Sequence, residues 1–224
     1  MSQLIIFEPS QLPIYGLCFG VTSGIALLLF YAGGFGGADS KALMCIALAL
    51  PFAPVGLVTP ILAGAVSPTS QVIFPFTIFG NAVLFAAVSG VYMVLRNFFW
   101  HKRTTTQMFP GSLASESVGK KLLVLITGYK MSVSRVKAKW HIFPMEDVDD
   151  QIVSLKRTLV IVPKDEGREK ILEHLSRAVD EGKIDSYVWA TPGLPMLIFV
   201  TLGLITALLL GDFVWLLVRS VLGA

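Results

Sequence analysis

The sequence predicts a polytopic α-helical membrane protein of about four transmembrane helices, with a small α+β insert between the third and the fourth. Of its 224 residues, 54% are hydrophobic and only 15% are charged, whereas soluble domains carry about 25% charged residues. The charges are also segregated, because 28 of the 33 Asp, Glu, Lys and Arg residues lie between Arg96 and Asp185. This pattern excludes the ordinary soluble, fibrous and disordered classes of protein.

Four apolar segments are long enough to span a bilayer, which takes about 20 residues. They lie at about residues 12–31, 42–66, 72–95 and 196–218. Three prolines in the second segment are expected to kink it, namely Pro51, Pro54 and Pro60. The predicted domains are a membrane domain over residues 1–95, an insert over 96–190 and a final transmembrane helix over 191–224.

Basic residues set the expected orientation, because they collect on the cytoplasmic side of a membrane. The third segment ends in Arg96, Lys102 and Arg103, so we expect the insert and the 31–41 turn to face the cytoplasm. The predicted location is the plasma membrane, with the lipid bilayer as a partner. The insert carries 16 basic and 12 acidic residues, a mixture that indicates a solvated surface rather than a nucleic-acid interface.

Within the insert, four stretches predict secondary structure. Residues 114–127 are amphipathic and fit either an interfacial helix or a strand. Residues 140–144 and 158–162 predict short strands, because they are β-branched or aromatic and lie next to proline. Residues 165–181 predict a helix, since their apolar positions repeat at helical spacing and Gly182 follows.

Asp39 is the main candidate for chemistry. It stands at the mouth of the second apolar segment, directly after Gly36, Gly37 and Ala38. A carboxylate near a helix N-terminus is favoured in its ionised form, and the glycines allow a close approach of another chain. An equally good interpretation from the residues alone is a helix N-cap with Lys41 extending towards the interface.

The run from Gly36 to Leu43 (Gly-Gly-Ala-Asp-Ser-Lys-Ala-Leu) resembles the archaeal type IV prepilin and preflagellin peptidases, which are membrane aspartic endopeptidases of the GxGD type. Ala38 stands where the GxGD pattern has its second glycine. Further stretches that resemble the family follow in chain order, at residues 74–82, 125–130, 143–146 and 188–195.

The resemblance implies an aspartic endopeptidase that removes leader peptides from membrane-embedded pilin-like or archaellin-like precursors at the cytoplasmic face. Asp39 is then one of two catalytic aspartates, with Gly36, Gly37, Ala38 and Lys41 as supporting residues of the motif. No metal or organic cofactor is expected. The three histidines lack the spacing of a metal site, and both cysteines are expected to be buried.

The second catalytic aspartate of the family has no counterpart in this sequence. Glu8 lies on the opposite side of the membrane in the expected topology, and Asp212 is expected to be a polar residue facing the helix bundle. We therefore expect the second carboxylate to come from a missing N-terminal segment or from another copy in a homo-oligomer. The alternatives are a catalytically inactive remnant and a non-enzymatic membrane scaffold.

Overall fold

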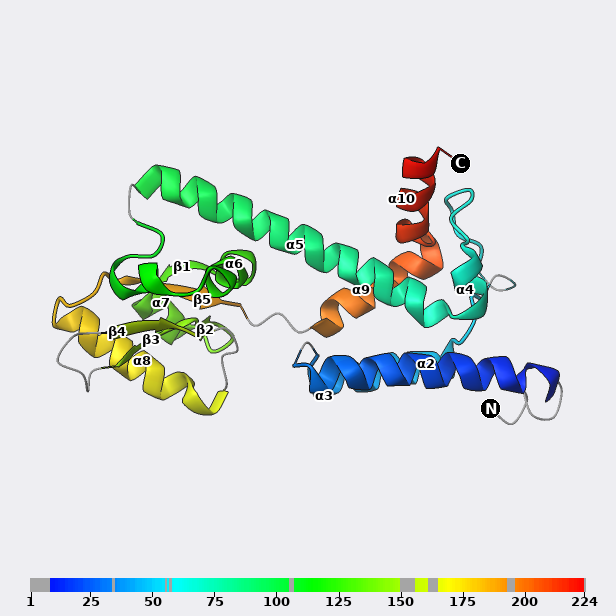
Figure 1. The fold of residues 1–224 in the computed structure, drawn as a ribbon, viewed down its shortest axis with the longest axis horizontal. Helices are drawn as coiled ribbons and strands as arrows, with labels where there is room; N and C mark the ends of the chain where they lie inside the picture. Colours follow the sequence, from blue (N-terminus) through cyan, green and yellow to red (C-terminus); the bar gives the residue numbers. More distant parts are fainter. Residues whose placement is uncertain are drawn as a thin grey trace. The chain divides into compact units, whose positions relative to one another are not determined.

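A computed structural model describes residues 9–33, 35–54, 56, 58–104, 107–149, 156–160, 165–192 and 196–223 (Figure 1). Contacts divide the chain into two compact units, one of residues Met1–Ala87 with Pro195–Ala224 and one of residues Val88–Leu194. The second unit starts eight residues before and ends four residues after the insert expected over residues 96–190. Helix α5 runs from the first unit into the second.

The first unit is helical. It contains η1 (Pro9–Gln11), α2 (Leu12–Tyr31), α3 (Gly37–Ala49), α4 (Pro68–Val72), the first half of α5 (Phe74–Thr104), α9 (Met196–Leu209) and α10 (Phe213–Leu222). Among the described residues, α2 and α5 are each long and apolar enough to cross a membrane. The pair α9 and α10, which is bent by 66°, can form a third span. The predicted number of four spans is not confirmed.

The second predicted segment differs from the structure. Helix α3 starts at Gly37 and ends at Ala49, whereas the sequence predicts a kinked transmembrane segment over residues 42–66. Pro51 explains the early end, because proline disfavours helical backbone in the residue before it and has no N–H to donate. The described residues from Leu50 to Ser67 contain no further helix.

Helices α2 and α3 pack side by side in antiparallel directions. The hydroxyl of Tyr15 donates to the carbonyl of Leu48, and the thiol of Cys18 lies 3.4 Å from the carbonyl oxygen of Pro51. Cys18 is fully buried, as expected, whereas Cys45 is exposed, so the prediction for the second cysteine is wrong.

Helices α5 and α9 approach each other closely at Gly203. A Cβ atom at this position would overlap the carbonyl oxygen of Ile78 and would lie 2.8 Å from the backbone nitrogen of Ala82. Apolar side chains surround the contact and form a buried cluster, which includes Phe74, Ile78, Ala82, Val200 and Ala207. Glycine therefore allows the two backbones to touch, as small residues do between membrane helices.

Replacing Gly203 with Ala is expected to lower the free energy of unfolding by about 1–3 kcal/mol, the usual cost of overpacking. Thermal unfolding in one detergent measures this loss. Gly16→Ala is the matched control, because nothing lies within 4 Å of a Cβ at Gly16 in α2 and Ala has the higher helix propensity. Equal melting temperatures for the two variants would contradict the close contact.

The second unit combines helices with two small sheets. Strands β1 (Tyr129–Ser132), β5 (Tyr187–Thr191) and β2 (Phe143–Pro144) form an antiparallel sheet in the order β1-β5-β2. Strands β3 (Glu146–Asp149) and β4 (Lys156–Leu159) form an antiparallel pair. The helices of this unit are η2 (Gly111–Ser115), α6 (Val118–Thr127), α7 (Val133–Ala138) and α8 (Asp165–Asp180). The expected helix over residues 165–181 is thus α8, and the ambiguous stretch at 114–127 forms η2 and the helix α6.

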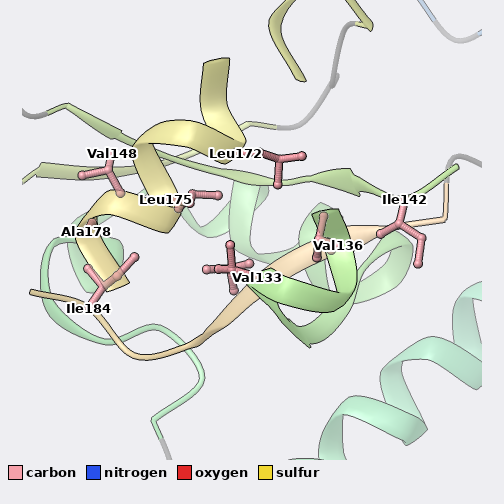
Figure 2. Close-up of a cluster of buried hydrophobic side chains, with 10 residues drawn as sticks. Val133, Val136, Ile142, Val148, Leu172, Leu175, Ala178 and Ile184 are labelled. Carbon is pink, nitrogen blue, oxygen red and sulfur yellow. The ribbon is translucent and has the colours of Figure 1, made fainter. Parts of the chain in front are cut away.

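The core of this unit lies between α7, α8 and the strands. Figure 2 shows Leu172, Leu175 and Ala178 on one face of α8, with Val133 and Val136 of α7 among the side chains around them. This apolar face of α8 is the one that its sequence periodicity predicts. The cluster gives the insert a hydrophobic core of its own.

A charged cluster is also buried in this unit. Glu146 is fully buried, and its Oε1 accepts hydrogen bonds from Lys130 Nζ at 2.9 Å and from the Trp189 backbone nitrogen at 2.8 Å. Its other oxygen accepts a hydrogen bond from Nη2 of Arg157. Lys130 and Arg157 are both buried as well. One carboxylate thus joins strands β1, β3, β4 and β5.

Candidate functional site

Asp39 lies in the first turn of α3, directly after the glycine-rich turn. The residue is only 8% exposed. Its Oδ2 accepts a hydrogen bond from the backbone nitrogen of Gly36 at 3.1 Å. Among the described residues, no partner donates a hydrogen bond to Oδ1. One carboxylate oxygen is therefore fixed by the backbone, and the other remains available to an incoming group.

The residues around Asp39 explain this geometry. Gly36 is the N-cap of α3, and a Cβ there would lie 3.0 Å from Oδ2 of Asp39, so the absence of a side chain makes room for the carboxylate. A Cβ at Gly37 would contact Phe30 at 3.7 Å. Ala38 and Lys41 are both exposed. These two motif residues therefore lie on the surface of the first unit.

Ser40 is a buried residue of the site that the sequence did not single out. Its Oγ lies 3.2 Å from the carbonyl oxygen of Ala26 and 3.2 Å from that of Gly36. The first contact connects the start of α3 to α2, 14 residues earlier in the chain. Ser40 thereby holds the turn that carries Asp39. In the sequence, only its position directly after Asp39 points to Ser40 as a residue of this site.

The N-cap interpretation of Asp39 needs refinement. Gly36 is the N-cap residue, and Asp39 is the third residue of the helix. The carboxylate of Asp39 accepts a hydrogen bond from the backbone N–H of Gly36. Such a bond stabilises a helix start, and the positive end of the helix dipole favours a carboxylate there. Because this role uses one oxygen, it is compatible with chemistry at the other.

Asp212 occupies a different place in the first unit. It is buried and caps α10, with Oδ1 accepting from the Trp215 backbone nitrogen at 3.0 Å. Its Oδ2 accepts from the hydroxyls of Ser67 at 2.6 Å and Thr77 at 3.1 Å. Asn81 completes this polar cluster, donating to the carbonyl of Gly211 at 2.9 Å and accepting from the backbone nitrogen of Phe213 at 3.0 Å. The cluster stabilises the break between α9 and α10.

Asp212 and Asp39 do not meet. Asp39 lies at the start of α3. The Asp212 cluster includes Ser67 and Thr77, and residues near these two in the chain bond to the backbone that follows the other end of α3. In particular, the backbone nitrogen of Phe74 donates to the carbonyl of Pro51 at 2.9 Å. Ala49 lies ten positions after Asp39 in α3, a rise of about 15 Å.

No second carboxylate lies beside Asp39 in the part of the first unit that the structure describes. Asp39 and Asp212 are its two acidic residues there, and Glu8 lies outside the described residues. The described residues also contain no group of three or more His, Cys, Asp or Glu side chains arranged to hold a metal ion. Within the described residues of the first unit, Asp39 is thus a single carboxylate at the mouth of α3.

Comparison with known proteins finds a family match in the later part of the chain. Residues 120–213 match the family model described as archaeal peptidase A24 C-terminus, type II. The match confirms the resemblance to the prepilin and preflagellin peptidase family over most of the insert, α9 and the break before α10. It does not include Asp39. No curated protein matches the chain.

Proposed function

We infer that this chain, with its peptidase A24 C-terminal region, is a membrane-embedded aspartic endopeptidase that removes leader peptides from pilin-like or archaellin-like precursors. The family match indicates a peptidase, and the two candidate spans indicate a membrane protein. The aspartic chemistry, the substrate and the cytoplasmic position of the site are the proposed part.

The observation that carries the aspartic assignment is the state of the Asp39 side chain. The carboxylate is buried at a helix mouth, it is held through Oδ2 by Gly36, and its Oδ1 has no partner among the described residues. The helix-start role accounts for the bond to Oδ2 and leaves Oδ1 without a partner, and the proposal assigns catalysis to that second oxygen.

The chemistry requires a second carboxylate. In an aspartic protease two close carboxyl groups share one proton, because like charges at short distance cannot both ionise. The ionised group takes a proton from the water that attacks the scissile carbonyl, and the protonated group polarises that carbonyl and then protonates the leaving amine. Asp39 supplies one group. Under this proposal, the other comes from a preceding segment of the protein or from a second copy.

The position of Asp39 supports the proposed substrate class. The residue stands at the end of two apolar helices, and α2 exposes apolar side chains, including Leu17 and Leu28. A precursor whose basic leader precedes a hydrophobic helix can lie beside them in the bilayer, with the leader junction at the helix mouth. The proposed substrate is therefore a membrane-inserted precursor rather than a soluble peptide.

The test uses the intact protein purified from its own membranes, after its mass and N-terminus have been determined. We expect this protein in lipid vesicles to cut a precursor that has a basic leader and an apolar helix, giving one new N-terminus by mass spectrometry. A precursor whose leader lysines and arginines are replaced by glutamine is the matched substrate control. A precursor that stays intact beside a folded protein would contradict the proposal and favour the inactive remnant.

A further inference from the structure

Helix α6 turns three of its apolar side chains away from the core of the second unit. Val124 is fully buried in a cluster with Leu113 and Trp189. By contrast Val118 is 80% exposed, Leu122 is 54% exposed and Leu123 is 44% exposed. Val118 and Leu122 are four residues apart and so lie on the same side of the helix.

The two lysines of α6 do not share this outward face. Lys120 forms an ion pair with Glu116 at 3.1 Å, and Lys121 donates to the carbonyl of Ala114. Both partners lie just before the helix in the chain. A helix on a solvated surface shows the opposite arrangement, with its charged residues turned outward.

Contacts with α5 show at which level α6 lies. A Cβ at Gly90 would lie 2.8 Å from Cγ2 of Ile126, so the end of α6 packs against this glycine. The Nδ2 of Asn97 donates to the carbonyls of Leu125 at 3.0 Å and Gly128 at 2.7 Å. Gly90 precedes Arg96, the first charged residue of α5, by six positions, or about 9 Å along the helix. The end of α6 therefore lies beside the apolar part of a candidate membrane span.

The side of α5 that faces away from Gly90 and Asn97, and so away from α6, is apolar as well. Val88, Val91, Tyr92 and Leu95 are each more than half exposed. A helix of the length and hydropathy of α5 fits a bilayer, and these side chains are then covered by lipid. The end of α6 lies at the level of this lipid-covered part of α5, so acyl chains are also available to cover the exposed apolar face of α6.

We propose that α6 is an interfacial membrane helix, with Val118, Leu122 and Leu123 immersed in the outer part of the acyl chains. Its partner is the lipid bilayer. An amphipathic helix of this kind lies in the plane of the interface, and the lysines extend to the headgroups as they do at membrane borders. The helix attaches the insert to the membrane independently of any peptidase activity.

Site-directed spin labelling of the full chain in lipid vesicles tests this. Cysteine is introduced singly at Val118, Leu122 or Leu123 in a Cys45→Ala background, in which the fully buried Cys18 is retained. Lys120→Cys and Ser134→Cys are the matched controls, since Ser134 is exposed on α7 of the same unit. Each nitroxide is probed with molecular oxygen, which concentrates in acyl chains, and with a water-soluble nickel chelate.

We expect collisions with oxygen to exceed those with the chelate at positions 118, 122 and 123, and the order to reverse at positions 120 and 134. Chelate access at position 122 equal to that at position 134 would overturn the proposal, because α6 would then face water. Protection of positions 118 and 122 from both probes would overturn it as well, since another protein surface would then cover the helix. Three independent positions keep the test decisive if one variant fails to fold.

Discussion

Replacement of Asp39 with Asn is expected to abolish precursor cleavage while leaving the protein folded. Asparagine cannot ionise or share a proton, so the paired carboxylate loses its partner, and general acid–base catalysis of this kind contributes about 10²–10⁴-fold in rate. The Asn amide oxygen can still accept the Gly36 N–H bond that Asp39 accepts now. The initial rate of cleavage in lipid vesicles, at equal amounts of folded protein, measures the effect.

Asp212→Asn is the matched control, because Asp212 is also buried but caps α10 and bonds Ser67 and Thr77 instead. We expect this variant to lose thermal stability and to keep its cleavage rate per folded molecule. If Asp39→Asn cleaved the precursor at the rate of the unchanged protein, the role of Asp39 would be confined to the start of α3.

Replacement of Glu146 with Ala is expected to destabilise the insert by about 3–5 kcal/mol, the usual cost of removing one partner from a buried ion pair. Burial lowers the pKa of Lys130, and the charge of Glu146 opposes that shift. Without the carboxylate, Lys130 and Arg157 are two buried cations with no counter-ion at this position, and the Trp189 N–H loses its acceptor. Hydrogen exchange of the β1 and β5 amides in the full chain measures this local loss.

Glu173→Ala is the control for this change. Glu173 pairs with Arg177 across one turn of α8, and both side chains are more than half exposed, so its loss should cost no more than about 0.5 kcal/mol. A variant in which Lys130, Glu146 and Arg157 become Met, Leu and Met should recover part of the stability lost in Glu146→Ala, because apolar residues of similar volume often replace buried ion pairs, although the Trp189 N–H still lacks its acceptor. Equal protection in the Glu146→Ala and Glu173→Ala variants would show that the cluster contributes little.

Local patterns predicted the elements that depend on local physics. The first apolar run was placed at residues 12–31, and α2 has these bounds. The spacing of Ile171, Leu172 and Leu175 predicted α8 to within one residue at its C-terminus. The basic residues predict an end of the third segment near residue 95, yet α5 continues to Thr104, because Arg and Lys favour helix and mark only the limit of the apolar part.

Long-range pairing explains what the sequence did not predict. Strand β1 contains Lys130, and β3 begins with Glu146 and Asp147, residues that indicate an exposed loop when they are considered alone. These segments form strands because of contacts that are distant in the chain. Lys130 bonds Glu146, 16 residues later, and both residues contact β5, more than 40 residues further along. At the candidate site, the motif predicted Asp39 at a helix mouth, but the contact of Ser40 with α2 depends on a fold that no local pattern specifies.

The short helices of the first unit have a consequence for the surrounding lipid. Helix α2 has 20 residues and spans about 30 Å, whereas α3 with 13 and α9 with 14 each cover only about 20 Å. The remaining depth beside α3 and α9 is filled by irregular backbone whose polar groups are bonded by Cys18, Asn81 and Asp212. The hydrophobic thickness of the protein is therefore uneven around its perimeter. We therefore expect the first unit to be more stable in thin bilayers than in thick ones.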